Sequence, residues 1–112
     1  DRVGAYLTEL GLEWDEDEAA ARLDGDTGNI YCRLPATAEG LPIFLCAHTD
    51  TVPPEGPIEP VVGEDGIVRS AGDTILGSDN KSAVVVMLEA ARRITREEMD
   101  AFKEGIRGMQ HR

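Results

Sequence analysis

An unbroken apolar run over residues 43–47, Ile-Phe-Leu-Cys-Ala, most constrains how this chain can fold. A short run without polar positions is typical of a strand that is buried on both of its faces. His48 and Asp50 follow at once, and residues two apart in a strand point to the same face. We therefore expect these side chains at the carboxyl end of a buried strand, where open α/β sheets bind ligands.

A second segment supplies another carboxylate, at the start of a predicted helix. Asp79 follows Gly77 and Ser78, and residues 82–94 are apolar almost all round, which predicts a helix packed deep against a sheet. On its own, Asp79 is most simply a helix N-cap, and His48 with Asp50 a hydrogen-bonded pair. Alternatively, an imidazole nitrogen and a carboxylate hold a divalent metal, with Asp50 fixing the other ring nitrogen.

The rest of the pattern predicts short elements around these two segments. Val3, Leu7 and Leu10 recur at helical spacing, so we expect a helix over residues 1–10, which suggests a fragment that opens inside a helix. Strands are expected over residues 12–14, 29–34 and 67–70, and an irregular loop over residues 51–66. Thr95 and Glu98 have the spacing of a capping box, which predicts a separate helix from residue 95 onward.

The composition excludes several classes of function. The 112 residues amount to one domain at most, and the formal net charge is −11, which disfavours nucleic acids and membrane surfaces as partners. No apolar run approaches the roughly 18 residues that span a bilayer. The two cysteines, Cys32 and Cys46, make no disulfide framework, so we expect a reducing, cytoplasmic setting.

Three other motifs were weighed. Asp24 and Asp26 are spaced as in a calcium-binding loop, but the later ligand positions are missing, and a plain turn is the better interpretation. Gly72 and Gly77 have the spacing of a phosphate-binding loop, but the following Ser78-Asp79 pair would repel phosphate. Cys46 could be a further metal ligand, although a thiol in an apolar strand is more often part of the core.

Two motifs in order, residues 47–54 (AHTDTVPP) and residues 72–83 (GDTILGSDNKSA), resemble the zinc-dependent exopeptidase and deacylase family. That family includes tripeptide aminopeptidase (peptidase T), carboxypeptidase G and the acetylornithine and succinyl-diaminopimelate deacylases. The resemblance implies an α/β fold with a central mixed sheet flanked by helices. It covers residues 1–94, as the amino-terminal part of a metallopeptidase catalytic domain, and leaves residues 95–112 as an amphipathic helical tail.

The resemblance also implies roles for individual residues. His48 corresponds to a zinc ligand, Asp50 to the catalytic carboxylate that orients that imidazole, and Asp79 to the carboxylate that bridges two zinc ions. Co²⁺ or Mn²⁺ are alternative metals. The implied substrates are short peptides or N-acyl amino acids, and family members often form homodimers through a lid domain that this chain lacks.

The family pattern continues with a Glu-Glu pair and a late His, which this chain does not clearly supply. Glu97 and Glu98 come directly off the helix and fit the capping box better, and His111 has no ligand-like context. The leading hypothesis is therefore a metal-dependent aminopeptidase-like hydrolase of which this chain is one part. The alternative is a catalytically inactive binding or interaction remnant of the same fold.

Overall fold

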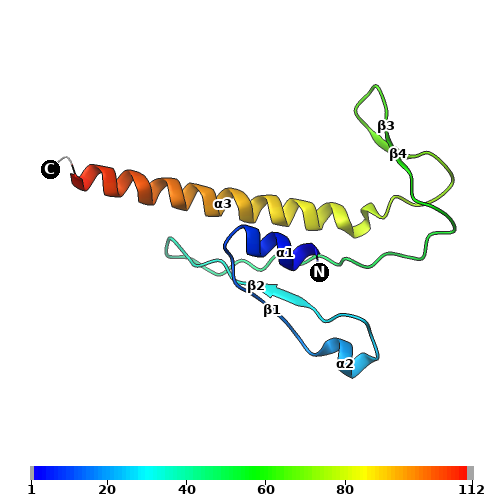
Figure 1. Cartoon of the computed structure of the whole chain (residues 1–112), viewed down its shortest axis with the longest axis horizontal. Coiled ribbons are helices and arrows are strands. Elements are labelled where there is room, and N and C mark those ends of the chain that lie inside the picture. Colours follow the sequence, from blue (N-terminus) through cyan, green and yellow to red (C-terminus); the bar gives the residue numbers. More distant parts are fainter. Residues whose placement is uncertain (1, 111–112) are drawn as a thin grey trace. The chain divides into compact units, whose positions relative to one another are not determined.

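The computed structural model describes residues 2–110, apart from the side chains of residues 98, 99, 102 and 108–110. Seven elements follow one another along the chain (Figure 1): α1 (Arg2–Glu9), β1 (Trp14–Glu16), α2 (Ala19–Leu23), β2 (Ile30–Cys32), β3 (Pro60–Val62), β4 (Val68–Ser70) and α3 (Ser78–Gln110). The predicted α/β class is confirmed. The chain forms two compact units, unit 1 (residues 1–42 and 88–112) and unit 2 (residues 43–87).

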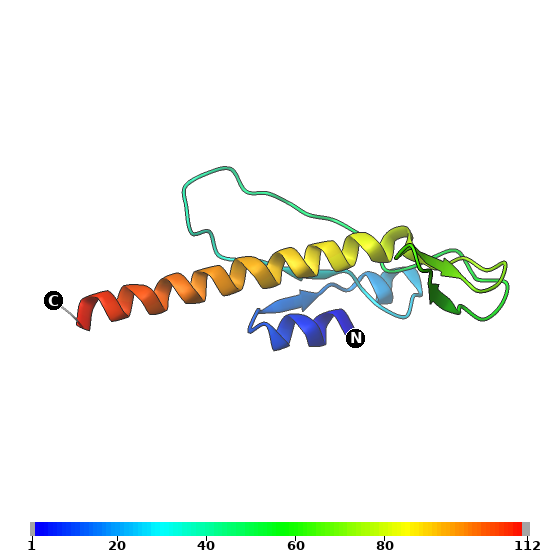
Figure 2. The same cartoon turned by 90° about the horizontal axis from the view of Figure 1, so that it is seen from above.

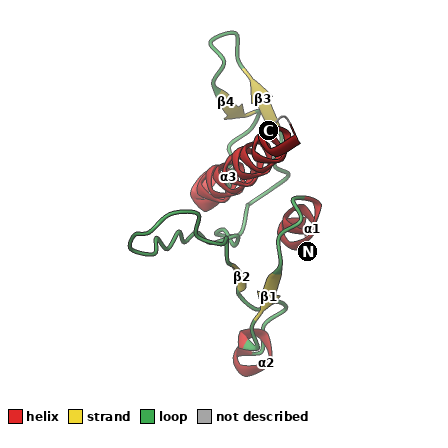
Figure 3. Cartoon of the chain, turned by 90° about the vertical axis from the view of Figure 1, so that its left-hand side faces the viewer, coloured by secondary structure: helices red, strands yellow, loops and turns green. Residues whose placement is uncertain are grey.

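In unit 1, a two-stranded antiparallel sheet follows α1. β1 pairs with β2 so that Trp14 lies opposite Cys32 and Glu16 opposite Ile30 (Figure 3). The long connection between these strands is fastened by Asp17, whose carboxylate accepts hydrogen bonds from the backbone N–H of Asn29 at 2.8 Å and from its side-chain amide at 2.9 Å. These bonds favour the ionised carboxylate and lower the pKa of Asp17.

The two strands of unit 1 were expected, one of them at a slightly different place. The predicted strand at residues 12–14 lies two residues later, as β1, while the predicted strand at residues 29–34 is confirmed in its centre as β2. A short helix, α2, precedes the acidic turn, and its C-cap residue, Asp24, has a positive φ of 54°. An aspartate tolerates this left-handed conformation better than most residues, so the turn needs no bound ion to explain it.

Helix α1 packs through a glycine onto the indole ring of Trp14. A side chain at Gly4 would overlap the six-membered part of that ring, and Leu7, on the same helix, is buried. The indole N–H donates to the Thr8 hydroxyl at 3.0 Å, and that hydroxyl donates to the Gly4 carbonyl at 3.0 Å. The absence of a Cβ at residue 4 therefore lets the ring approach the helix backbone.

Unit 2 contains a β-hairpin that the sequence predicts only in part. β4 was expected, but β3 lies inside the predicted irregular loop; it pairs antiparallel with β4, with Val61 opposite Arg69. Gly66 takes a φ of +75° in the turn, and the Arg69 guanidinium binds the Asp65 carboxylate with contacts of 2.7 and 3.0 Å. The hairpin is thus specified by its turn and a side-chain pair more than by apolar alternation.

The prediction of a buried strand over residues 43–47 is wrong. The segment forms no strand, as Figure 2 shows, and Ile43, Phe44 and Leu45 are 86%, 78% and 55% exposed. A strand is stable only with neighbours that accept its backbone hydrogen bonds and cover its faces. Neither two-stranded sheet of the described chain includes this segment.

Helix α3 begins earlier and ends later than predicted. It starts at Ser78 with non-helical backbone angles at Asp79 and Asn80, and it continues past Thr95 without a break (Figure 1). The separate helix from residue 95 is therefore wrong: the Thr95 hydroxyl donates to the Ala91 carbonyl at 2.8 Å, which is a contact inside a helix and not a cap. The Glu98 side chain lies outside the described residues.

The central part of α3 is less buried than its apolar pattern predicts. Ala91 is buried, but Val85 and Val86 are mostly exposed, so the prediction of deep packing for residues 82–94 is wrong.

Within the described residues, no helix is both long enough and apolar enough to cross a membrane.

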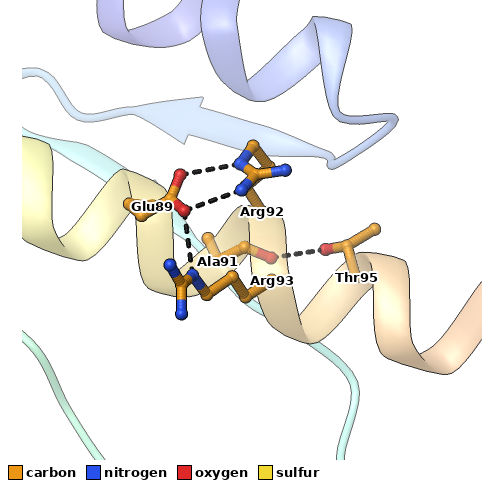
Figure 4. A network of polar contacts seen from close by, with 5 residues as sticks. All are labelled: Glu89, Ala91, Arg92, Arg93 and Thr95. Atoms are coloured by element: carbon orange, nitrogen blue, oxygen red, sulfur yellow. Dashed lines mark hydrogen bonds and ion pairs between the residues drawn. The ribbon is translucent and has the colours of Figure 1, made fainter.

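Polar contacts reinforce α3 where it lies in unit 1. The Glu89 carboxylate accepts two hydrogen bonds from Arg92, each 2.7 Å long, and one from Arg93 at 2.9 Å (Figure 4). These contacts span three and four residues, the spacings at which side chains on one helix face meet. The arginine hydrogen bonds lower the pKa of Glu89 to about 2.

We expect Gly4→Ala to destabilise the protein by about 1–3 kcal/mol, because the new methyl group displaces the Trp14 ring. Gly105→Ala is the matched control: it also lies within a helix, but its Cβ would meet no atom within 4 Å. That change should stabilise by about 0.5–1 kcal/mol through helix propensity. Urea unfolding followed by circular dichroism measures both, and equal stability of Gly4→Ala and wild type would contradict the packing.

We expect Glu89→Gln to be less stable than wild type at pH 7 and equal to it near pH 2. The folded-state pKa of Glu89 lies below its ordinary value of 4.5. Its contribution is therefore complete above pH 4.5 and disappears as the pH falls towards 2. Urea-unfolding midpoints across this range test the expectation. Glu104→Gln, on the same helix and without an ion pair among the described residues, should change little; a constant difference between Glu89→Gln and wild type at every pH would argue against the network.

Candidate metal centre

Unit 2 brings together the imidazole and the carboxylate that the sequence singles out as metal ligands. His48 lies in the segment between β2 and β3, and Asp79 in the first turn of α3. The His48 Nε2 atom is 3.3 Å from the Asp79 Oδ1 atom. The His48 side chain is 50% exposed and that of Asp79 96% exposed, so solvent and ions reach both groups.

The other imidazole nitrogen is held by Asp50. His48 Nδ1 is 2.9 Å from the backbone carbonyl oxygen of Asp50 and 3.2 Å from its carboxylate oxygen Oδ1. A carbonyl oxygen can only accept a hydrogen bond, so Nδ1 carries the proton and donates. In the neutral ring the lone pair is then on Nε2, the atom that faces Asp79.

The backbone acceptor has no counterpart in the sequence analysis, which assigned the orientation of the ring to the Asp50 carboxylate. Every residue carries a carbonyl group, so no sequence signal marks one that binds an imidazole. The carbonyl oxygen is the nearer partner of Nδ1, at 2.9 Å. The carboxylate oxygen lies slightly further away, at 3.2 Å. Two oxygens of one residue therefore hold the same ring nitrogen.

These neighbours also set the protonation of the ring. The hydrogen bond that Nδ1 donates to the Asp50 carbonyl and the negative charges of the Asp50 and Asp79 carboxylates raise the pKa of His48. A raised pKa stabilises the folded state below the ordinary value of 6.5, and this contribution is lost as the pH rises through the folded-state value. When the imidazole is protonated, Nε2 also carries a hydrogen, which points to the Asp79 carboxylate 3.3 Å away.

Asp79 does not act as the N-cap that its position alone suggests. Its φ and ψ of −91° and 102° are non-helical, as those of an N-cap are, but in the described part of the chain no backbone N–H at the start of α3 donates to its carboxylate. The Ser82 hydroxyl donates to the Ser78 carbonyl at 2.8 Å, a contact within the first turn that accepts no backbone N–H. The Asp79 carboxylate is thus left to face His48.

The structure gives no contact between this pair and the other candidate ligands that it describes. Cys46 is exposed, which contradicts its interpretation as a core thiol, and Cys32 is partly buried in β2. Glu97 lies on the surface of α3 in unit 1, and His111 lies outside the described residues. Among the residues that the structure describes, no three His, Cys, Asp or Glu side chains converge closely enough to hold a metal ion.

Comparisons with known proteins relate the chain to peptidases. No model of a known protein family matches it. It is 34% identical over 94 residues to the uncharacterized protein YqjE of Bacillus subtilis (strain 168), a match that covers 84% of this chain and 25% of the relative. The chain therefore spans about a quarter of the length of this relative.

Two solved structures resemble the chain in both sequence and fold. A tripeptidase from Staphylococcus aureus is 35% identical, with a TM-score of 0.77, and the aminopeptidase PepT from Bacillus cereus is 37% identical, with a TM-score of 0.75. Each match covers 87% of this chain and 26% of the solved chain. The chain is thus similar to part of a tripeptidase and part of an aminopeptidase.

We expect Asp79→Asn and Asp50→Asn each to lower the pKa of His48, because each change removes a negative charge beside the imidazole. The ring should nevertheless keep its proton on Nδ1 in Asp50→Asn, since the backbone carbonyl remains. Nitrogen-15 NMR titration of the imidazole reports both the pKa and the tautomer. Asp73→Asn, in the loop before α3, is the control; an unchanged His48 pKa in Asp79→Asn would show that the two side chains do not meet in solution.

Proposed function

We propose that His48 and Asp79 are zinc ligands in a metallopeptidase site that hydrolyses short peptides or N-acyl amino acids. The observation that carries the proposal is the 3.3 Å separation of His48 Nε2 and Asp79 Oδ1. In tetrahedral zinc sites with ligand bonds of about 2.0–2.2 Å, neighbouring ligand atoms lie roughly 3.3–3.6 Å apart. The two atoms are therefore spaced as adjacent ligands of one ion.

The chemistry of the two groups supports the same proposal. Asp50 holds Nδ1, which leaves the Nε2 lone pair for a metal, and a carboxylate such as Asp79 has two oxygens, so it can bridge two ions. In hydrolases of this kind, bound zinc lowers the pKa of a water and polarises the carbonyl that is attacked. Co²⁺ or Mn²⁺ would suit the same nitrogen and oxygen atoms. We propose a cytoplasmic setting, in keeping with two free cysteines.

The similarity to a tripeptidase and an aminopeptidase supports the substrate class. The chain spans about a quarter of those structures. We therefore assign no further metal ligand and no general base to residues of this chain. The role of Asp50 within the proposal is to position the His48 ring.

A second candidate is a catalytically inactive binding or interaction domain with the same fold. It is favoured by the finding that the described residues contain no third side chain close enough to complete a metal site. The two candidates differ in turnover. Hydrolysis of di- and tripeptides in the presence of Zn²⁺ or Co²⁺, abolished by a chelator, would exclude the second candidate, and its absence at high protein concentration would favour it.

We expect the protein to bind Zn²⁺ weakly, and His48→Ala and Asp79→Ala each to reduce the affinity by at least about tenfold, because each removes one ligand. Asp50→Asn should have a smaller effect, since its carbonyl still holds the ring. Zinc titration by calorimetry measures the affinities, with Asp73→Ala as the control. Wild-type affinity in both alanine variants would refute the proposed ligands.

A further inference from the structure

Gly77 occupies an unusual position in unit 2. It is the one buried residue among residues 43–87, and its φ of +74° lies in the left-handed region, where a side chain is strained. It lies in the loop that leads from β4 to α3, two residues before Asp79. Its conformation therefore sets the direction in which the chain enters the first turn of α3.

The segment that carries His48 passes close to this glycine. A Cβ atom on residue 77 would be 3.3 Å from the methyl group of Thr51, a distance tighter than most such contacts, and 3.6 Å from the Lys81 ammonium. Thr51 directly follows Asp50, so the contact joins the two segments that supply the metal ligands. A methyl group at residue 77 would therefore require Thr51 or the loop to shift by a few tenths of an ångström.

The loop has little freedom to absorb such a displacement elsewhere. The Thr74 hydroxyl lies 2.9 Å from the Ser70 hydroxyl at the end of β4, and it also donates to the Pro57 carbonyl at 3.2 Å. Its methyl group lies 3.4 Å from where a Cβ on Gly56 would be. Because hydrogen bonds hold the loop at Thr74, a displacement of residue 77 would mainly move Asp79.

We infer that Gly77 is a positioning residue for the pair formed by His48 and Asp79. Its left-handed backbone and its lack of a side chain allow the loop before α3 to lie against Thr51, which places the Asp79 carboxylate 3.3 Å from the imidazole. The expected effect on zinc affinity rests on the proposed function. The position of Gly77 relative to Thr51 and Asp79 does not depend on a metal.

The test compares Gly77→Ala with wild type by two measurements. The first, made without metal, is the nuclear Overhauser effect between the His48 ring protons and the Asp79 β protons, which should be present in wild type and lost in the variant. The second is zinc affinity by calorimetry, which should fall about 10- to 100-fold, as for other residues that orient metal ligands. Gly77→Asn, which tolerates a positive φ, should show the same losses with less backbone strain.

Two controls separate the close approach from other effects of a new methyl group. Gly66→Ala introduces the same backbone strain at a φ of +75°, and Gly72→Ala changes the same loop; neither Cβ would meet an atom within 4 Å. Both should keep the Overhauser effect and the zinc affinity. Thr51→Ser removes the opposing methyl group and should restore part of both signals to Gly77→Ala.

Three results would overturn the inference: an Overhauser effect and zinc affinity in Gly77→Ala within about twofold of wild type, an equal loss in Gly66→Ala, or no recovery with Thr51→Ser. If wild type binds no zinc, the proposed ligands fail, and the metal-free measurement still decides whether Gly77 positions Asp79. If Gly77→Ala does not fold, Gly77→Asn and its combination with Thr51→Ser provide the same comparison.

Discussion

Few apolar side chains leave water in this structure, and the rest of its described features depend on that constraint. Among the described residues only Leu7 and Ala91 are buried hydrophobic side chains, and both belong to unit 1. A typical buried aliphatic side chain contributes about 1.5–3 kcal/mol, so two of them cannot offset the entropy of ordering a chain of this length. The contacts of Asp17, of Trp14 and of the pair Asp65 and Arg69 therefore have a larger share in fixing the fold than in a well-packed domain.

The candidate metal centre follows the same logic. His48, Asp50 and Asp79 are held by their own hydrogen bonds and by a close backbone approach, and not by a surrounding core. Two negative charges face one imidazole, an arrangement that favours a positive charge at Nε2. In the protonated ring a proton supplies that charge, and a divalent cation would supply it in the proposed site, so protons and metal compete for one position.

The sequence predicted elements well where the signal was local. The helical spacing of Val3, Leu7 and Leu10 corresponds to α1, and the β-prone residues around Tyr31 and Arg69 correspond to β2 and β4. It also paired His48 with Asp79, residues that the structure brings within 3.3 Å. The Asp50 carbonyl could not be predicted, because a backbone group has no sequence signal.

The two predictions of burial that failed share one physical cause. The apolar run at residues 43–47 and the valines of α3 were expected to be buried, because such residues normally lie in a core. Burial needs a second surface, however, and the pattern of one segment says nothing about which other segments cover it. The prediction of a separate helix from residue 95 failed for another reason. Thr95 and Glu98 have the spacing of a cap, but the Thr95 hydroxyl donates to the Ala91 carbonyl.

The exposure of Ile43, Phe44 and Leu45 also affects the thermodynamics of unfolding. The heat capacity of unfolding arises mainly from apolar surface that is newly hydrated, at about 12–15 cal/mol/K per residue for ordinary globular proteins. Side chains that are already hydrated in the folded state add little to this quantity. The chain should therefore have a flatter dependence of stability on temperature than a well-packed domain of equal length, and a shallower response to urea.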